Sequence, residues 1–296
     1  MLVGFLKVAY YADAIAHNAL WQYDHFLRVI AVSWMATFTN LFKTTYGWEG
    51  VSMDSVITTI HQCMQRGERP LSIIDLIEKD LLTIEQAAWL VSRIEEGSSW
   101  LVGAIPGHAG KTTLMSALLV FLQAQEQATL AHPGLSWESF GQNACVVAEE
   151  ISDHNRKGYL WGEDVRGLAS IPGRGGRMAA TLHATTLEQV HEQISRRCAA
   201  GDDAVASFGV FVPIEVTYAD DPLAEGQLPE GGRRNRTIDS RTVELIHCYG
   251  NGQWNTIDRE IALTRKEEAI SGFLRSCLES DIREVEALRK AWLAER

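Results

Sequence analysis

The segment with the most evident chemistry is Gly107-His108-Ala109-Gly110-Lys111-Thr112-Thr113, which combines small residues with a lysine and two hydroxyls. A glycine-rich turn can direct consecutive backbone N–H groups at a phosphate, and a helix that begins directly after it adds its positive end. Lys111 would then reach the terminal phosphates of a nucleotide, and the Thr112 hydroxyl would hold Mg²⁺. The segment predicts a phosphate-binding loop with ATP and Mg²⁺ as its ligands.

This loop departs from the usual pattern G-x-x-x-x-G-K-[ST] at the first position. That position falls on Ile105, and the nearest glycine upstream is Gly103. The flanks still fit, because the apolar run Trp100–Ala104 predicts a buried strand and the run Thr113–Gln123 predicts a helix. Two alternatives remain open: an ordinary loop with a solvated lysine, and a phosphate loop distorted by a side chain where glycine permits close approach.

A phosphate loop that hydrolyses nucleotide needs a carboxylate partner, and the run Ala144–Ile151 offers two at the end of an apolar stretch. We expect this run to be a strand beside the strand of the loop, where Glu149 would hold a Mg²⁺-bound water and Glu150 would polarise the attacking water. A strand that runs into a solvated turn is the alternative. Glu163, which follows Gly162, is a weaker candidate because its surroundings favour a helix.

A histidine also falls at a position where ligands bind in α/β sheets. The run Met178–Leu182 predicts a strand, and His183 stands at its C-terminal end. The carboxyl ends of parallel strands form the ligand-binding edge of an open sheet. His183 could therefore sense the terminal phosphate, although a single histidine at such a position is more often structural.

Composition restricts the class of protein. The 296 residues are 46% hydrophobic and 22% charged, which is enough for one large α/β core or two smaller ones. The net charge of −11 disfavours a nucleic-acid partner. The five cysteines are odd in number and scattered, which predicts reduced thiols in a cytoplasmic protein and argues against a zinc site.

Local signals divide the rest of the chain. The uncharged run Val29–Phe42 is too short for a confident membrane span and predicts a buried helix, with an interfacial helix as the alternative. Arg66–Pro70 reads as a linker. Thr83 and Gln86 form a capping box that opens a helix through Glu96. The hydrophobic stripe in 265–296 predicts an amphipathic helix, more typical of a packed surface helix than of a partner-binding one.

Taken in order, these motifs resemble the secretion ATPase superfamily, the motors of type II and type IV secretion, type IV pili and archaeal surface filaments. The matching pieces are a lead-in helical segment, the strand–loop–helix unit, the acidic strand, a histidine box and a closing hairpin on Asn-Gly. They span Leu71–Leu90, Gly97–Leu122, Val146–Asp153, Ala180–Ala184 and Arg241–Ile257. In this resemblance Glu150 takes the place of the family's catalytic glutamate, Asp153 that of the following acid, and His183 that of the box histidine.

The resemblance implies an α/β fold: a RecA-like P-loop NTPase core with a mainly parallel sheet and flanking helices at 71–260. From the residues themselves we expect a small helical region at 1–70 before this core and the amphipathic helix at 261–296 after it. The resemblance also implies a Mg²⁺-dependent ATPase, a homo-oligomer with a hexamer as the expected size, and a membrane platform protein as partner. A peripheral position at the inner face of a membrane would follow. The alternative is a degenerate relative that binds nucleotide as a switch or scaffold and hydrolyses little.

Departures from the family pattern favour that alternative, whereas the intact residues Lys111, Thr112, Glu150 and His183 favour the ATPase. Ile105 replaces the first loop glycine, Glu149 replaces the glycine before the catalytic glutamate, and Gly176 stands where many members carry a further histidine. Glu138 is the available candidate for the family's acidic box, which lies on a strand. Residues 1–70 do not resemble the family's N-terminal domain, which supplies arginines to the active site. The arginines nominated instead are Arg66, Arg69, Arg174 and Arg177.

Overall fold

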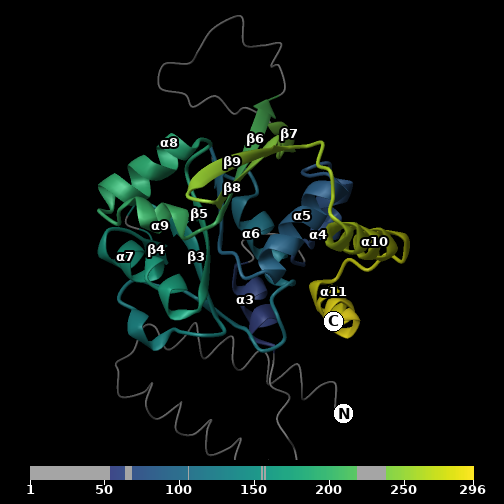
Figure 1. Ribbon diagram of the computed structural model, residues 1–296, viewed down its shortest axis with the longest axis horizontal. Coiled ribbons are helices and arrows are strands. Elements are labelled where there is room, and N and C mark those ends of the chain that lie inside the picture. The colour runs from purple at the N-terminus through teal and green to yellow at the C-terminus, as the bar shows by residue number, and fades with distance from the viewer. Residues whose placement is uncertain (1–53, 64–68, 106, 155, 157, 219–237) are drawn as a thin grey trace, which may run out of the picture. The chain divides into compact units, whose positions relative to one another are not determined.

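The computed structural model describes residues 54–63, 69–105, 107–154, 156, 158–218 and 238–296. The uncharged run 29–42 and Arg66 lie outside these residues. The described chain is a mixed α/β structure with a mostly parallel central sheet and helices packed on it (Figure 1). None of its described helices is long and apolar enough to cross a bilayer.

The order of the strands decides which functional residues can meet. Within the described residues the main path of the sheet is β2-β3-β5-β1-β6-β8-β9, with β4 beside β3 and β7 beside β6. The strands are β1 Trp100–Ala104, β2 Gln127–Leu130, β3 Ala144–Ile151, β4 Tyr159–Leu160, β5 Arg177–Leu182, β6 Val210–Tyr218, β7 Ile238–Thr242, β8 Leu245–Gly250 and β9 Gln253–Asp258. β1 to β6 pair in parallel, whereas β7, β8 and β9 pair antiparallel. The sequence suggested that the acidic strand β3 lies directly beside β1, the strand that precedes the loop. That expectation was wrong. β5, the histidine strand, lies between them.

Helices cover both faces of the sheet because successive side chains of a buried strand point to opposite faces. Trp100 and Val102 of β1 join a hydrophobic cluster with α3–α6, α10 and α11, whereas Leu101 joins a second cluster with α7, η3 and α9. Figure 1 shows these two groups of helices on opposite sides of the strands. The helices are α3 Ser55–Cys63, α4 Ile73–Glu78, α5 Ile84–Glu95, α6 Lys111–Leu119, α7 Glu163–Ala169, α8 Leu187–Val190, the π-helix η3 His191–Arg197, α9 Asp202–Ala206, α10 Arg265–Glu279 and α11 Val285–Glu295, with short 3₁₀ turns η1 Trp137–Ser139 and η2 Pro172–Arg174.

Two local predictions are confirmed in detail. The Thr83 side chain caps α5 and accepts from the backbone N–H of Gln86, whose own side chain returns to the Thr83 backbone. The β8–β9 hairpin turns at Asn251 and Gly252, whose φ angles of 54° and 78° are the positive values that a type I′ turn requires. Both features depend on chemistry within a few residues, which is why the sequence displays them.

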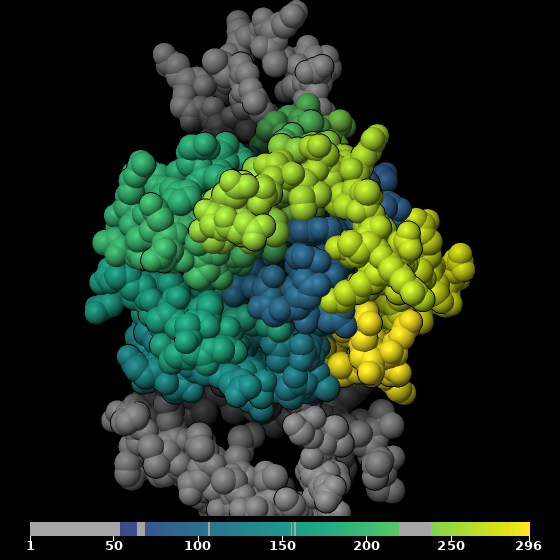
Figure 2. All heavy atoms as spheres, in the orientation of Figure 1, coloured from purple at the N-terminus to yellow at the C-terminus, as the bar shows by residue number. Residues whose placement is uncertain are grey.

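The prediction of one C-terminal amphipathic helix was wrong, because the segment forms two helices. The chain after α10 reverses at Asp281, which has a φ of 58°, and the Ile282 N–H donates to the Cys277 carbonyl at 2.9 Å. Such a left-handed residue with a return hydrogen bond ends a helix. α10 and α11 then share the hydrophobic cluster of α3–α6, and Figure 2 shows the yellow C-terminal residues against the blue early part of the described chain. The domain boundaries at residues 70 and 260 stay predictions.

α11 is anchored to the end of α6, the helix that follows the loop. The Arg289 guanidinium is buried and donates to the carbonyls of Val120, at 2.8 Å, and of Leu122. It also pairs with Asp54 just before α3, with Nε 3.0 Å from Oδ2. The carbonyls at a helix end have no partner within the helix, and a buried arginine there satisfies them. The C-terminal helix thus fixes the far end of α6.

Candidate functional site

The loop adopts a strand–turn–helix arrangement. β1 ends at Ala104, and α6 begins at Lys111 with Gly110 as its N-cap residue at a φ of 97°. His108 also has a positive φ, 67°, which is uncommon for a residue with a side chain. The first N–H groups of α6 have no partner within the helix, so this end is suited to an anion.

The misplaced glycine has a structural explanation. A Cβ atom on Gly103 would lie 2.2 Å from the carbonyl oxygen of Ala184, which follows β5. Gly103 therefore permits the close packing of β1 against the chain after the histidine strand. Ile105, at the position where the pattern has its first glycine, is 50% exposed and points away from the core.

A buried ion pair joins the loop to the acidic strand. Lys111 Nζ lies 3.3 Å from Glu150 Oε2, and the two side chains are 6% and 7% exposed. The other carboxylate oxygen of Glu150, Oε1, is buried and has no hydrogen-bond partner. A buried charged oxygen without a partner is costly, so this atom indicates a site completed by a ligand or water.

His183 completes the group. Its Nε2 lies 3.9 Å from Glu150 Oε2, and Gln193 of η3 holds the segment by donating to the His183 carbonyl at 2.7 Å. Burial lowers the pKa of His183 and the nearby Lys111 cation lowers it further, against the opposing effect of Glu150. A lowered pKa favours the neutral imidazole. The structure thus brings together Lys111, Glu150 and His183.

Glu149 is separate from this group. Within the described residues no hydrogen bond or ion pair links its carboxylate to Lys111, Glu150 or His183. Burial raises the pKa of Glu149. Its role as a metal ligand stays a prediction.

The residues present fit a magnesium–nucleotide complex in one respect. The described chain contains no group of three or more His, Cys, Asp or Glu side chains that could hold a metal ion. Mg²⁺ in nucleotide sites does not need such a group, because phosphate oxygens and waters fill most of its ligand positions. The Thr112 hydroxyl, one residue into α6, makes no hydrogen bond within the described part of the chain. It is available as the protein ligand.

The nominated arginines that the structure describes are engaged elsewhere. Arg69 pairs with Asp75 at 2.6 Å, and Arg174 donates to carbonyls around η1. Arg177 is buried at the N-terminal end of β5, where its Nε lies 2.6 Å from Glu126 Oε1. These arginines were nominated because they lie near the motifs in the sequence. Such proximity does not tell at which end of a strand a residue lies.

The structure also places the remaining acids that the sequence singled out. Glu138 is exposed on η1 rather than on a strand, so the structure does not support it as the family's acidic box. Asp153 pairs with Arg197 of η3 and lies beside His154. Glu163 begins α7, as its surroundings predicted.

One arginine beside the loop was missed. Arg241 of β7 donates from Nη2 to the His108 carbonyl at 3.4 Å. In the sequence Arg241 only begins the segment that resembles the family's closing hairpin, and nothing there indicates a contact with the loop. That contact arises from the pairing of β7 with β6. The loop, the acid, the histidine and this arginine come from four separate segments of the sequence.

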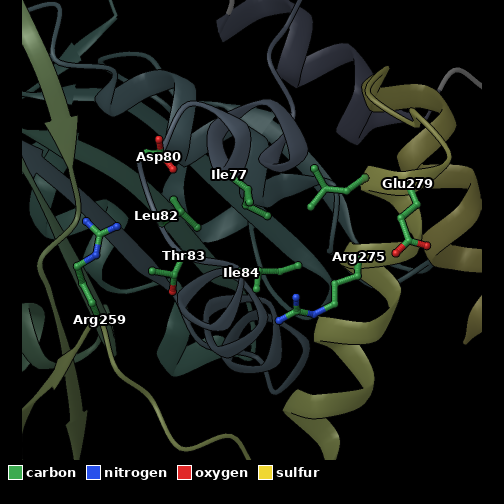
Figure 3. Close-up of a pocket in the computed structure, with 9 residues that line it drawn as sticks. Ile77, Asp80, Leu82, Thr83, Ile84, Arg259, Arg275 and Glu279 are labelled. Carbon is green, nitrogen blue, oxygen red and sulfur yellow. The ribbon is translucent and has the colours of Figure 1, made fainter.

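A hollow lies away from the candidate site, between the α4–α5 turn, α10 and Arg259 (Figure 3). Its wall combines apolar side chains, such as Ile77 and Leu82, with charged ones. Arg275 in this wall already pairs with Glu85 at 2.7 Å. None of the lining residues belongs to the loop segment, so the hollow is separate from the candidate site.

Comparison with known proteins gives little. No family model matches the chain, and no curated protein matches it. Among solved structures, it is similar to the VirB11 ATPase of the type IV secretion system of Brucella suis, crystallised with sulphate, at a TM-score of 0.31 and 14% identity. The match covers 61% of this chain and 66% of that chain, slightly under two thirds of its length. A likeness this weak carries no functional conclusion.

Proposed function

We propose that this protein is a Mg²⁺-dependent ATPase with a RecA-like P-loop core. The observation that carries the proposal is the buried pair of Lys111 and Glu150 at the N-terminus of α6, with the unpartnered oxygen of Glu150 beside it. A lysine, a helix N-terminus and a carboxylate at one place are the parts that bind a polyphosphate and activate water. Gly107 to Thr113 would form the cradle.

The residues have distinct parts in the hydrolysis. Lys111 would turn from Glu150 to the terminal phosphates. Glu150 would then accept a proton from water as the water oxygen bonds to the terminal phosphorus, while the bond to the bridging oxygen breaks and ADP leaves. When bound with the nucleotide, Mg²⁺ supplies positive charge to the phosphate oxygens. Neutral His183 would donate a hydrogen bond to the terminal phosphate and report its presence.

For the wider role, we propose a motor that couples hydrolysis to assembly or transport by a membrane-anchored machine, as the resemblance to secretion and pilus ATPases implies. The chain would act as a homo-oligomer, with a hexamer as the expected size, on a membrane platform protein at the cytoplasmic face. Motif order supports this proposal. Light scattering with and without a non-hydrolysable ATP analogue tests it, and a monomer under both conditions would exclude the ring.

A switch with little hydrolysis is the second candidate, and two observations favour it. Ile105 departs from the loop pattern and is exposed. Lys111 is already held by Glu150 at 3.3 Å, so phosphate binding has to replace an existing interaction. Such a protein would bind nucleotide and change state without rapid turnover.

Phosphate release with Mg-ATP separates the two candidates. We expect Glu150→Gln to lower kcat by about 100-fold or more, the usual contribution of a positioned general base, with ATP affinity retained. Glu163→Gln, which alters an exposed acid at the start of α7, is the matched control and should leave kcat unchanged. ATP binding without turnover would support the switch, and no nucleotide binding at all would exclude both candidates.

A further inference from the structure

Arg241 lies beside the loop, and its strand is on the opposite side of β1 from the strand of Glu150. It sits on β7, which pairs antiparallel with β6 through Val216 and Arg241. Its Nη2 donates to the His108 carbonyl at 3.4 Å, and its Cδ lies 4.0 Å from where a Cβ on Gly110 would be. The side chain therefore lies along the loop, between Gly110 and the His108 carbonyl.

This guanidinium is exposed and has no carboxylate partner among the described residues, although most other described arginines pair with an acid. Its contact with the loop is a single long hydrogen bond to a neutral carbonyl. An arginine has five donors in a planar fork that matches phosphate oxygens. Most of the donors of Arg241 are free for a ligand.

The sheet order gives the site two sides. β3, which carries Glu150, and β5, which His183 follows, lie on one side of β1, and β6 with β7 lies on the other. The unpartnered Oε1 of Glu150, on a side chain only 7% exposed, marks where the reacting end of a ligand belongs. The rest of a nucleotide bound by the loop would extend away from Glu150, toward β6 and β7.

We propose that Arg241 binds the α-phosphate of the nucleotide, within the same subunit, and so fixes which way the nucleotide lies across the loop. This inference rests on the proposed nucleotide site. Arg241 would contact a phosphate group that ATP and ADP share. The α-phosphate would then be bound on the β7 side of the site, and water would be activated on the β3 side.

The test compares affinities for ADP and for a non-hydrolysable ATP analogue by titration calorimetry, together with kcat for ATP. Arg241→Ala should weaken both affinities about tenfold or more and by the same factor, with kcat at saturating ATP within about twofold of wild type. Arg241→Lys, which keeps the charge without the fork, should lie between. Arg259→Ala is the control, because Arg259 lies after β9 and pairs with Glu244 at 3.0 Å.

Two results would overturn the inference alone: unchanged affinities in Arg241→Ala while wild type binds nucleotide, or a loss of kcat with ADP affinity unchanged, which would place Arg241 at the terminal phosphate. Failure of wild type to bind either nucleotide would overturn the proposed function and this inference with it. Because Arg241 is exposed, the melting temperature of the variant should equal that of wild type, which shows that the fold is intact.

Discussion

Replacement of Lys111 should destabilise the fold, in addition to any effect on nucleotide binding. Lys111 and Glu150 are 6% and 7% exposed and their charged atoms lie 3.3 Å apart, so each neutralises the other in a site with little water. Removing one partner of such a buried pair leaves an uncompensated charge and costs about 3–5 kcal/mol. For a domain of this size that corresponds to a fall in melting temperature of about 6–20 °C. Lys111→Ala should show this loss without any ligand present.

Urea unfolding followed by tryptophan fluorescence measures the free energy of unfolding for Lys111→Ala, Glu150→Gln and the double variant. The double variant should be more stable than Lys111→Ala alone, because the uncharged amide of glutamine then replaces the buried carboxylate. Lys266→Ala is the matched control: Lys266 pairs with Glu95 at 3.1 Å but is 39% exposed, and exposed pairs contribute about 1 kcal/mol or less.

A loss below about 1 kcal/mol in Lys111→Ala, equal to that of the exposed control, would refute the reasoning. It would mean that water reaches Glu150 freely. Strict additivity of the two single changes would also refute it, because groups in direct contact are expected to couple. A change in the urea dependence of the unfolding free energy would instead report an altered unfolded or native state.

Three further predictions concern the frame of the site. Arg289→Ala should lower the free energy of unfolding by about 2 kcal/mol or more in urea unfolding, because it leaves buried carbonyls at the end of α6 without a donor. Gly103→Ala should lower the free energy of unfolding by about 1–3 kcal/mol, and with it the melting temperature, because the new Cβ would lie 2.2 Å from the Ala184 carbonyl oxygen. A Cβ at Gly107 would meet nothing within 4 Å, so Gly107→Ala should have a much smaller effect. Burial raises the pKa of Glu149, so the folded state favours the protonated carboxyl group, and this contribution to stability is lost as pH rises through the folded-state pKa. Glu149→Gln should therefore have a higher melting temperature than wild type at pH 8 and lose that difference by pH 4.

The sequence predicted the features that local chemistry specifies. Trp100–Ala104 forms a strand, Thr83 caps a helix and Asn251-Gly252 turns a hairpin, and each depends on residues within one element. Strand order is different, because hydrophobic runs such as β1, β3 and β5 read alike in sequence, and nothing in them says which lies in the centre. The same gap hid Arg241, which reaches the loop through the pairing of β7 with β6.

Which of two adjacent acids faces the lysine is decided by an irregularity in the sheet. Side chains alternate along a strand, and Val146 and Ala148 of β3 belong to the cluster opposite α6, whereas Val147 belongs to the cluster of α6. The pairing of β3 with β5 shifts register between Ala148 and Ile151, at the two glutamates. Such a shift bends the strand and redirects its side chains, and these irregularities are frequent beside active sites. Strict alternation would place Glu150 on the face opposite to α6, yet its carboxylate lies beside Lys111. The position of Glu150 therefore depends on how β3 pairs with β5, which the residues of β3 alone do not predict.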